Sequence, residues 1–319
     1  MPRGPRQIHR GHLTEITIKT FQARFLLTPS KLINRLIIGV LALAQEKYAL
    51  TVCAVVVMSN HDQVLVVPKS ESQVMRFCRY VSSNISREVG RLRGWTGGIF
   101  RRRYTDIVVT HEVAAHAGRL RYLLSHGVKE GLVRRPQDWP GVHSLKALLG
   151  SFRLRGDWVD RTGLYEARRR SKRRGTRKSK RPREADYTKS KVLVLSKIPA
   201  WEHLSDEEYR LAVADLVDSI LEEHEERRQS APKNVRRVLA SDPTYRPETT
   251  KRSPKPHCHA ASREERENYR QIRRSFVNAY LEASALVKER SRRALELFPP
   301  GCFLPPLGLE FLAESPRAG

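Results

Sequence analysis

Two side chains that can bind a metal ion lie two positions apart in a β-branched segment. In VVVMSNHDQVLVV (residues 55–67), Val and Leu residues predict strands on both sides of a short break. Side chains alternate between the two faces of a strand, so His61 and Gln63 share one face and Asp62 points to the other. This pair is half of a plausible metal site. On spacing alone, His61 is more often an ordinary polar residue near the start of a strand than a metal ligand.

A tyrosine and a histidine follow at helical spacing in RLRYLLSHGVKEGLV (residues 119–133). Tyr122 and His126 are four residues apart, which places them on the same face if this segment is helical. A tyrosine hydroxyl is a potential nucleophile, and an imidazole is a potential ligand or base. The ordinary alternatives are a core aromatic for Tyr122 and, for His126, a residue favoured at a helix C-terminus by the helix dipole.

The elements that must position these residues predict an α+β fold. Strand patterns cover residues 12–19, 51–58, 61–67 and 106–110, and helical patterns cover about 28–48, 72–92 and 110–125. We expect Thr28 and Thr110 to cap the first and third helices, and Gly127 to end the third. The order β-α-β-β-α-β-α, with mostly antiparallel pairing, predicts a ferredoxin-like antiparallel sheet packed with helices.

The charge of the chain points to a polyanionic partner. The 319 residues have a formal net charge of +26, and nucleic acid is the commonest polyanion that such a protein meets. A ribosomal-type surface or an anionic membrane surface are the alternatives. No segment approaches the roughly 20 apolar residues that span a bilayer, so we expect no membrane partner. The apolar run at 32–45 begins too far into the chain, and is too interrupted by polar residues, for a signal peptide.

The four cysteines are widely separated and form no C-x-x-C pair. We therefore expect neither a disulfide scaffold nor a structural zinc site, which fits a cytoplasmic protein. The sequence His257-Cys258-His259 could bind a metal, but its Pro/Lys-rich surroundings favour an ordinary loop.

A basic loop, GWTGGIFRRRY, precedes the fourth strand. In it Arg101, Arg102, Arg103 and Tyr104 mix positive charge with an aromatic ring, a combination that suits a DNA strand with exposed bases. A solvated loop beside a core strand is an equally good interpretation of this composition.

The composition changes after about residue 149. We expect three parts: an α/β domain at 1–150, a basic linker at 151–200 and a helical C-terminal extension at 201–319. Within the linker, residues 168–183 contain eleven Lys or Arg and no acid, so this run is a solvated linker or a nucleic-acid arm. Capping boxes at 205–208 and 262–265 predict two amphipathic helices, which could pack on each other or on the first domain.

Considered together, these motifs resemble a family. The MSNH strand, the FQARFLL segment, the FRRRY loop, the YLLSHGVKEGLV helix and the following RRPQDWPGVHS stretch look like REP-associated tyrosine transposases. These belong to the HUH superfamily of single-strand DNA endonucleases. The resemblance covers most of residues 12–149 and makes residues 1–150 the transposase domain. It does not extend to the tail.

The resemblance implies a mechanism and a set of roles. His61 would be the first metal ligand, Gln63 would replace the second histidine of the motif, and His126 would be a further ligand. The metal would be Mg²⁺ or Mn²⁺. Tyr122 would attack single-stranded or hairpin DNA, leaving a 5′-phosphotyrosine and a free 3′-OH, and the ester would conserve the bond energy for rejoining. The protein would act as a monomer or a homodimer.

Asp62 departs from the family motif, which has a hydrophobic residue at this position. A buried carboxylate without a partner is costly. Three explanations remain open: the strand end is frayed and Asp62 is solvated, a bulge brings it into the metal site, or the protein has lost catalysis. The last would make it an inactive, domesticated DNA-hairpin-binding protein. An RNA-binding protein of the same fold is less favoured, because no RNP-type aromatic strand motif is present.

Overall fold

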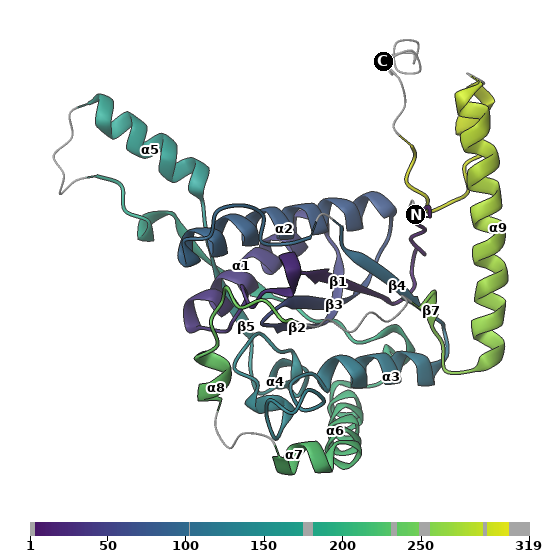
Figure 1. Ribbon diagram of the computed structural model, residues 1–319, viewed down its shortest axis with the longest axis horizontal. Helices are drawn as coiled ribbons and strands as arrows, with labels where there is room; N and C mark the ends of the chain where they lie inside the picture. Colours follow the sequence, from purple (N-terminus) through teal and green to yellow (C-terminus); the bar gives the residue numbers. More distant parts are fainter. Residues whose placement is uncertain are drawn as a thin grey trace.

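The computed structural model describes residues 4–101, 103–174, 181–230, 235–248, 256–289 and 292–305, and has the predicted α+β architecture (Figure 1). Its first elements are β1 (Thr14–Lys19), α1 (Lys31–Tyr48), β2 (Thr51–Met58), β3 (His61–Val67), α2 (Glu71–Arg93), β4 (Thr105–Val109) and α3 (Val113–Leu124). The sheet order is β2-β3-β1-β4, with every neighbouring pair antiparallel. This is the order of the ferredoxin-like fold.

A fifth strand from far along the chain extends this sheet. β7 (Cys258–His259) pairs with β4 in the parallel direction. From its composition, the His257-Cys258-His259 stretch is predicted to be an ordinary loop, and the strand is a difference from that prediction. Two residues contain too little periodicity to predict a strand, and the partner strand lies about 150 residues earlier in the chain.

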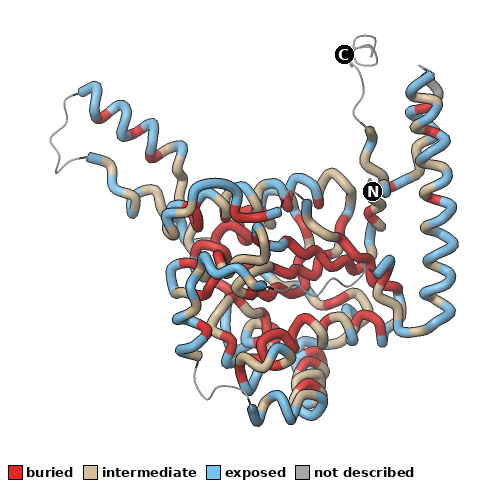
Figure 2. The backbone as a smooth tube through the Cα atoms, viewed as in Figure 1, coloured by how far each residue is buried: buried red, intermediate tan, exposed pale blue. Residues whose placement is uncertain are grey.

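The sheet separates two hydrophobic cores. α1 and α2 cover one face, while α3 and α6 (Asp206–Glu223) lie on the other (Figure 1). Figure 2 shows that the buried residues concentrate in the sheet and in the helix sides that face it. Since β3 is covered on both faces, its central residues are buried whichever way they point.

α1 is covered on its outer side as well. Its residues 36–44 are all buried, because an antiparallel hairpin of β5 (Leu154–Val159) and β6 (Thr188–Leu193) packs against the helix. At the contact, a Cβ added to Gly39 would lie 2.1 Å from the Asp157 carbonyl oxygen. The glycine therefore permits a close approach that no side chain would allow.

The hairpin lies inside the segment 151–200, for which we predicted a basic linker. Between its strands is α5 (Arg161–Arg173), a mostly exposed helix that projects away from the sheet (Figure 1). The described part of the basic run is thus helical up to Arg173. The hairpin was not predicted, because Arg155, Lys189 and Lys191 interrupt its apolar pattern.

The helix caps differ from those predicted. α1 is capped by Ser30, whose Oγ accepts from the Ile33 N–H at 3.2 Å. Thr28 instead donates to the Phe25 carbonyl. α3 begins after Glu112, and Thr110 donates its hydroxyl hydrogen to the Glu112 carboxylate at 2.8 Å. Each predicted threonine lies two residues before the actual cap, where turns and caps favour the same residue types.

The two capping-box helices do not pack on each other. α6 begins at the predicted Ser205 box and packs against α3. α9 (Arg263–Lys288), capped by Ser262, lies instead beside the N-terminal segment, where His9 Nε2 and the Tyr269 hydroxyl are 3.1 Å apart. The remaining described α-helices are short: α4 (Leu145–Leu148), α7 (Glu225–Ser230) and α8 (Arg236–Leu239). None of the described helices is long and apolar enough to cross a membrane.

Candidate active site

The face of the sheet that is turned toward α3 has a row of polar residues. In the β1–β3 ladder, Thr17 pairs with Gln63 and Lys19 pairs with His61. Directly paired residues point to the same face, so these four side chains share it with Glu15. Asp62 points to the opposite face, as the strand alternation predicts.

α3 and the turn after it bring Tyr122 and His126 to this row. The helix ends at Leu124, and His126 lies in the turn that follows. Gly127 continues the turn at a φ of 91°, a left-handed conformation that favours glycine. The Tyr122 and His126 rings have centroids 5.1 Å apart, and the His126 and His61 rings have centroids 5.5 Å apart. All of these residues meet within one chain.

Gln63 completes the group. The His126 Nε2 and Gln63 Oε1 atoms are 2.5 Å apart. His61 Nδ1 lies 2.7 Å from the Asn60 side-chain oxygen, which orients the ring and leaves its Nε2 without a hydrogen-bond partner among the described residues. The structure thus brings together the four residues that the sequence analysis selected.

Both imidazoles are in the protonation state that metal binding requires. Burial, with help from the Lys19 charge, lowers the pKa of His61 to about 4. Burial and the neighbouring His61 also lower the pKa of His126 well below its ordinary value. At neutral pH the two rings are therefore uncharged, and a cation does not have to displace a proton from them.

The donor types fit a divalent cation. Within the described ranges, no group of three or more His, Cys, Asp or Glu side chains is arranged to hold a metal ion. The present trio has only two members of those types, because its third donor is the amide oxygen of Gln63. Two imidazoles and a carbonyl oxygen can bind Mn²⁺ or Mg²⁺. In addition, the second ring nitrogen of His126 is buried without a hydrogen-bond partner in the described structure.

Tyr122 lies between two cations, which the sequence analysis did not select. The Arg119 guanidinium carbon and the Lys129 ammonium nitrogen each lie 3.9 Å from the centre of its ring. Contacts of this kind fix the ring by cation–π attraction. Arg119 precedes Tyr122 by three residues, so helical spacing could have predicted its contact with the ring. Lys129 reaches Tyr122 only because the chain turns at Gly127, which the spacing does not predict.

A buried carboxylate holds one of these cations in place. Glu15 on β1 is only 2% exposed, forms an ion pair with Arg119 and accepts a hydrogen bond from Thr17 at 3.0 Å. His259 of β7 also lies 3.5 Å from it. Burial alone would raise the pKa of Glu15, but His259 and Arg119 outweigh burial and lower it to about 2. The carboxylate is therefore charged, and it connects β1, α3 and the C-terminal strand.

Asp62 is neither solvated nor part of the metal site, so both of those explanations are wrong. It is 2% exposed on the face that α1 and α2 cover, and its Oδ1 accepts from the Ile18 N–H at 3.0 Å. Burial raises its pKa to about 7. The β3 end is not frayed, because its ladder to β1 is regular through His61. Asp62 thus has a local backbone partner and lies on the face opposite to His61 and Gln63.

The basic loop lies at the end of the sheet near β4. The Arg101 side chain is exposed while its N–H donates to the Lys19 carbonyl. Arg103 is exposed, and Arg102 lies outside the described residues. Tyr104 is partly buried, with the Arg6 guanidinium 3.9 Å above its ring. That ring is therefore already stacked on a cation, and the expected contact of this loop with DNA stays a prediction.

No protein-family model matches the chain, and no curated protein sequence matches it. Among solved structures, it is similar to a REP-associated tyrosine transposase bound to a REP hairpin, with 15% identity and a TM-score of 0.40. That match covers 48% of this chain and 90% of the other.

It is also similar to a putative transposase from Deinococcus radiodurans, with 15% identity and a TM-score of 0.27. This second match covers 38% of this chain and 95% of the other. Fold similarity at this level does not define a function, which has to be inferred from the side chains of the site.

Proposed function

We propose that this protein is a metal-dependent transposase-type nuclease that cuts and rejoins single-stranded or hairpin DNA through Tyr122. The observation that supports this is the convergence of Tyr122, His126, His61 and Gln63 on one face of the sheet. If Tyr122 or either histidine had only a structural role, there would be no reason for the other three side chains to lie beside it. A tyrosine nucleophile beside a set of neutral metal donors is an arrangement that can support phosphodiester cleavage.

His61, Gln63 and His126 would hold the Mg²⁺ or Mn²⁺ ion. When bound, the ion would polarise the scissile phosphate and stabilise negative charge that develops on it. The other roles belong to the protein. Arg119 and Lys129 fix the plane of the Tyr122 ring and add positive charge where an anionic phosphate has to approach.

In the chemical step, the Tyr122 hydroxyl oxygen forms a bond to phosphorus and loses its proton. The bond from phosphorus to the 3′ oxygen breaks, and this oxygen takes up a proton to leave as a free 3′-OH. The products are a 5′-phosphotyrosine and a 3′-hydroxyl end. Since the phosphoester remains, attack by another 3′-OH can reverse the step without ATP.

The test is a search for the covalent adduct. The full chain would be incubated with labelled single-stranded hairpins from the flanks of its own gene, with Mn²⁺ or Mg²⁺, and analysed on denaturing gels. We expect an adduct that EDTA and Tyr122→Phe abolish and that peptide mass spectrometry assigns to Tyr122. The matched control is Tyr165→Phe on α5, because Tyr165 is 67% exposed and distant in the fold.

Two results would count against the proposal. An adduct that persists in Tyr122→Phe would exclude this nucleophile. Tight hairpin binding without an adduct would favour the inactive, domesticated hairpin-binding protein, provided that a functional relative cuts its own hairpins in the same assay.

A further inference from the structure

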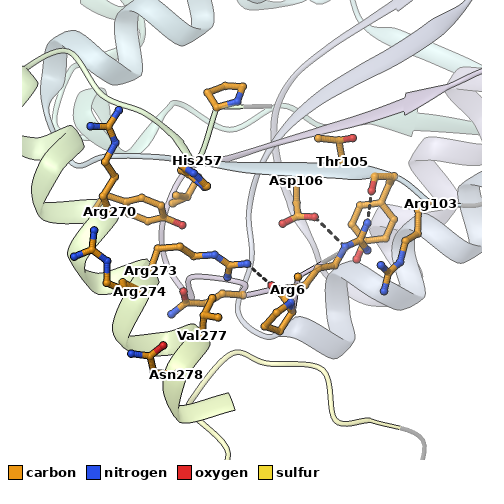
Figure 3. A pocket seen from close by; sticks show the side chains of 17 residues that line it. Arg6, Arg103, Thr105, Asp106, His257, Arg270, Arg273, Arg274, Val277 and Asn278 are labelled. Atoms are coloured by element: carbon orange, nitrogen blue, oxygen red, sulfur yellow. Dashed lines mark hydrogen bonds and ion pairs between the residues drawn. The ribbon is translucent and has the colours of Figure 1, made fainter. Parts of the chain in front are cut away.

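An arginine-lined cleft lies on the far side of β4 from α1. It has a volume of about 810 Å³ and is enclosed by the N-terminal segment, the start of β4 and α9. Figure 3 shows Arg6 and Arg103 on one side and Arg270, Arg273 and Arg274 on the helix opposite. Its volume is in the range of ligand pockets, about 300–1,000 Å³.

The positive charge of the cleft is only partly compensated. Arg6 forms an ion pair with Asp106 at 3.2 Å, and Arg270 forms one with Glu267 at 2.9 Å. Asp106 is the only acidic side chain among the lining residues. Arg103 and Arg274 form no ion pair with any part of the chain that the structure describes. Five guanidinium groups therefore surround a space with one carboxylate in it, which is an environment for an anion with several charges.

The wall formed by α9 is held in place. Arg273 donates a hydrogen bond to the Pro5 carbonyl, and Tyr269 contacts His9 through its hydroxyl at 3.1 Å. β7, just before this helix, is hydrogen-bonded to β4. Because the N-terminal segment and β4 hold α9 in place, its backbone does not have to be ordered when a ligand binds, and only the arginine side chains lose freedom.

The cleft lies at the β4 edge, on the opposite face of the sheet from the proposed active site, because Asp106 pairs with Ile16, which packs under α1 and α2. Thr105 lines it and pairs with Thr17, which pairs on its other side with Gln63. Two strand spacings, roughly 10 Å, separate Thr105 from Gln63 in the sheet. Three nucleotides of a stacked strand, with a rise of about 3.4 Å each, would cover that distance directly, so a strand that passes around the β4 edge needs more than about three.

From these observations we infer that the cleft binds the phosphodiester backbone of the single-stranded DNA that flanks the phosphate that is cut. The inference rests on the proposed function for the identity of the nucleic acid. Arginines recognise phosphates in bidentate geometry, and a cleft of this size admits one strand. The contacts are made with the backbone, so they add affinity and set the path of the strand without reading its sequence.

The test is equilibrium binding of the full chain to a fluorescent single-stranded DNA in EDTA, where no cutting occurs. The cleft variant is Arg270→Gln with Arg274→Gln, both exposed on α9. The control, Arg76→Gln with Arg79→Gln, removes the same charge from exposed positions on α2. Thermal melting by circular dichroism would show that both variants remain folded.

We expect the cleft variant to bind about tenfold more weakly, and the slope of log K against log salt to fall in magnitude by about 1.4, or about 0.7 for each lost phosphate contact. The control should change the dissociation constant less than about twofold. Equal losses in both variants, or no loss in the cleft variant, would overturn the inference. Tighter binding of an RNA of the same sequence would overturn the assignment to DNA.

The two proposals can fail separately. If Tyr122 forms no adduct while the cleft variant still loses affinity, the cleft is a single-strand binding site in a protein that does not cut. If the adduct forms while binding by the cleft variant is unchanged, only the cleft inference is wrong.

Discussion

In the proposed metal site, Gln63 would determine which cation is preferred. Its neutral carbonyl oxygen, together with two imidazoles, gives the donor set no negative charge. Imidazole suits Mn²⁺ better than Mg²⁺, which binds carboxylate and water oxygens more readily. At a given concentration we therefore expect Mn²⁺ to support more adduct than Mg²⁺.

Replacing Gln63 by a carboxylate of the same length should shift this preference. In Gln63→Glu, the Mg²⁺ concentration for half-maximal adduct formation should fall on the order of tenfold, because the added charge attracts a hard cation. A titration of adduct yield against Mg²⁺ measures it. Gln229→Glu, at an exposed position on α7, is the control and should have no effect. An unchanged Mg²⁺ requirement in Gln63→Glu would show that Gln63 is not a ligand.

The lowered pKa of Glu15 predicts that its contribution to the free energy of unfolding depends on pH. Its pKa is lowered from 4.5 in the unfolded chain to about 2. A lowered carboxyl pKa stabilises the fold above the unfolded value, and this stabilisation is lost as the pH falls from about 4.5 through about 2. At pH 7, Glu15→Gln should lower the free energy of unfolding by about 3 kcal/mol.

Urea unfolding of the wild type and Glu15→Gln at a series of pH values would check this. The difference between the two proteins should be constant above about pH 5 and should shrink below it. The control Glu166→Gln removes a carboxylate from an exposed i,i+4 pair with Arg170, which contributes little. A pH-independent difference for Glu15→Gln would contradict the ion pair with Arg119.

At the scale of elements, the β5–β6 hairpin depends on a glycine contact. A methyl group added at Gly39 would lie 2.1 Å from the carbonyl oxygen of Asp157 and 2.3 Å from its carbonyl carbon. Backbone cannot rotate away as a side chain can, so Gly39→Ala should destabilise the protein by at least about 1–3 kcal/mol. Chemical denaturation gives this value.

The matched control for this substitution is Gly118→Ala in α3. An added Cβ at Gly118 meets nothing within 4 Å, and the residue is exposed within a helix. This change should be neutral or stabilising by up to about 1 kcal/mol. If Gly39→Ala behaved like Gly118→Ala, the hairpin would not pack on α1 as closely as described.

At the scale of the whole molecule, the net charge of +26 should dominate the binding of nucleic acid. Each phosphate neutralised on a single strand contributes about −0.7 to the slope of log K against log salt. If about six phosphates are contacted, affinity should fall about 300-fold between about 50 and 200 mM salt. Fluorescence anisotropy at several salt concentrations measures the slope, and a flat dependence would show that the basic surface does not contact the strand.

Local sequence patterns were enough to predict the elements of the first 125 residues and the face of the sheet to which the side chains of each strand point. Strand alternation separated His61 and Gln63 from Asp62, and helical spacing placed Tyr122 near His126. These are local properties, since a period of two or 3.6 residues is set by neighbours in the chain. The same local information predicted the α6 and α9 caps correctly but displaced those of α1 and α3 by two residues.

Only the tertiary structure decided which distant side chains complete the site. Glu15 meets Arg119, and His259 meets Glu15, because β1, α3 and β7 converge from three parts of the chain. The β5–β6 hairpin and the arginine-lined cleft likewise depend on contacts between segments more than 100 residues apart. Such contacts leave no period in the sequence. Their energy comes from burial and charge pairing that exist only once the segments have packed together.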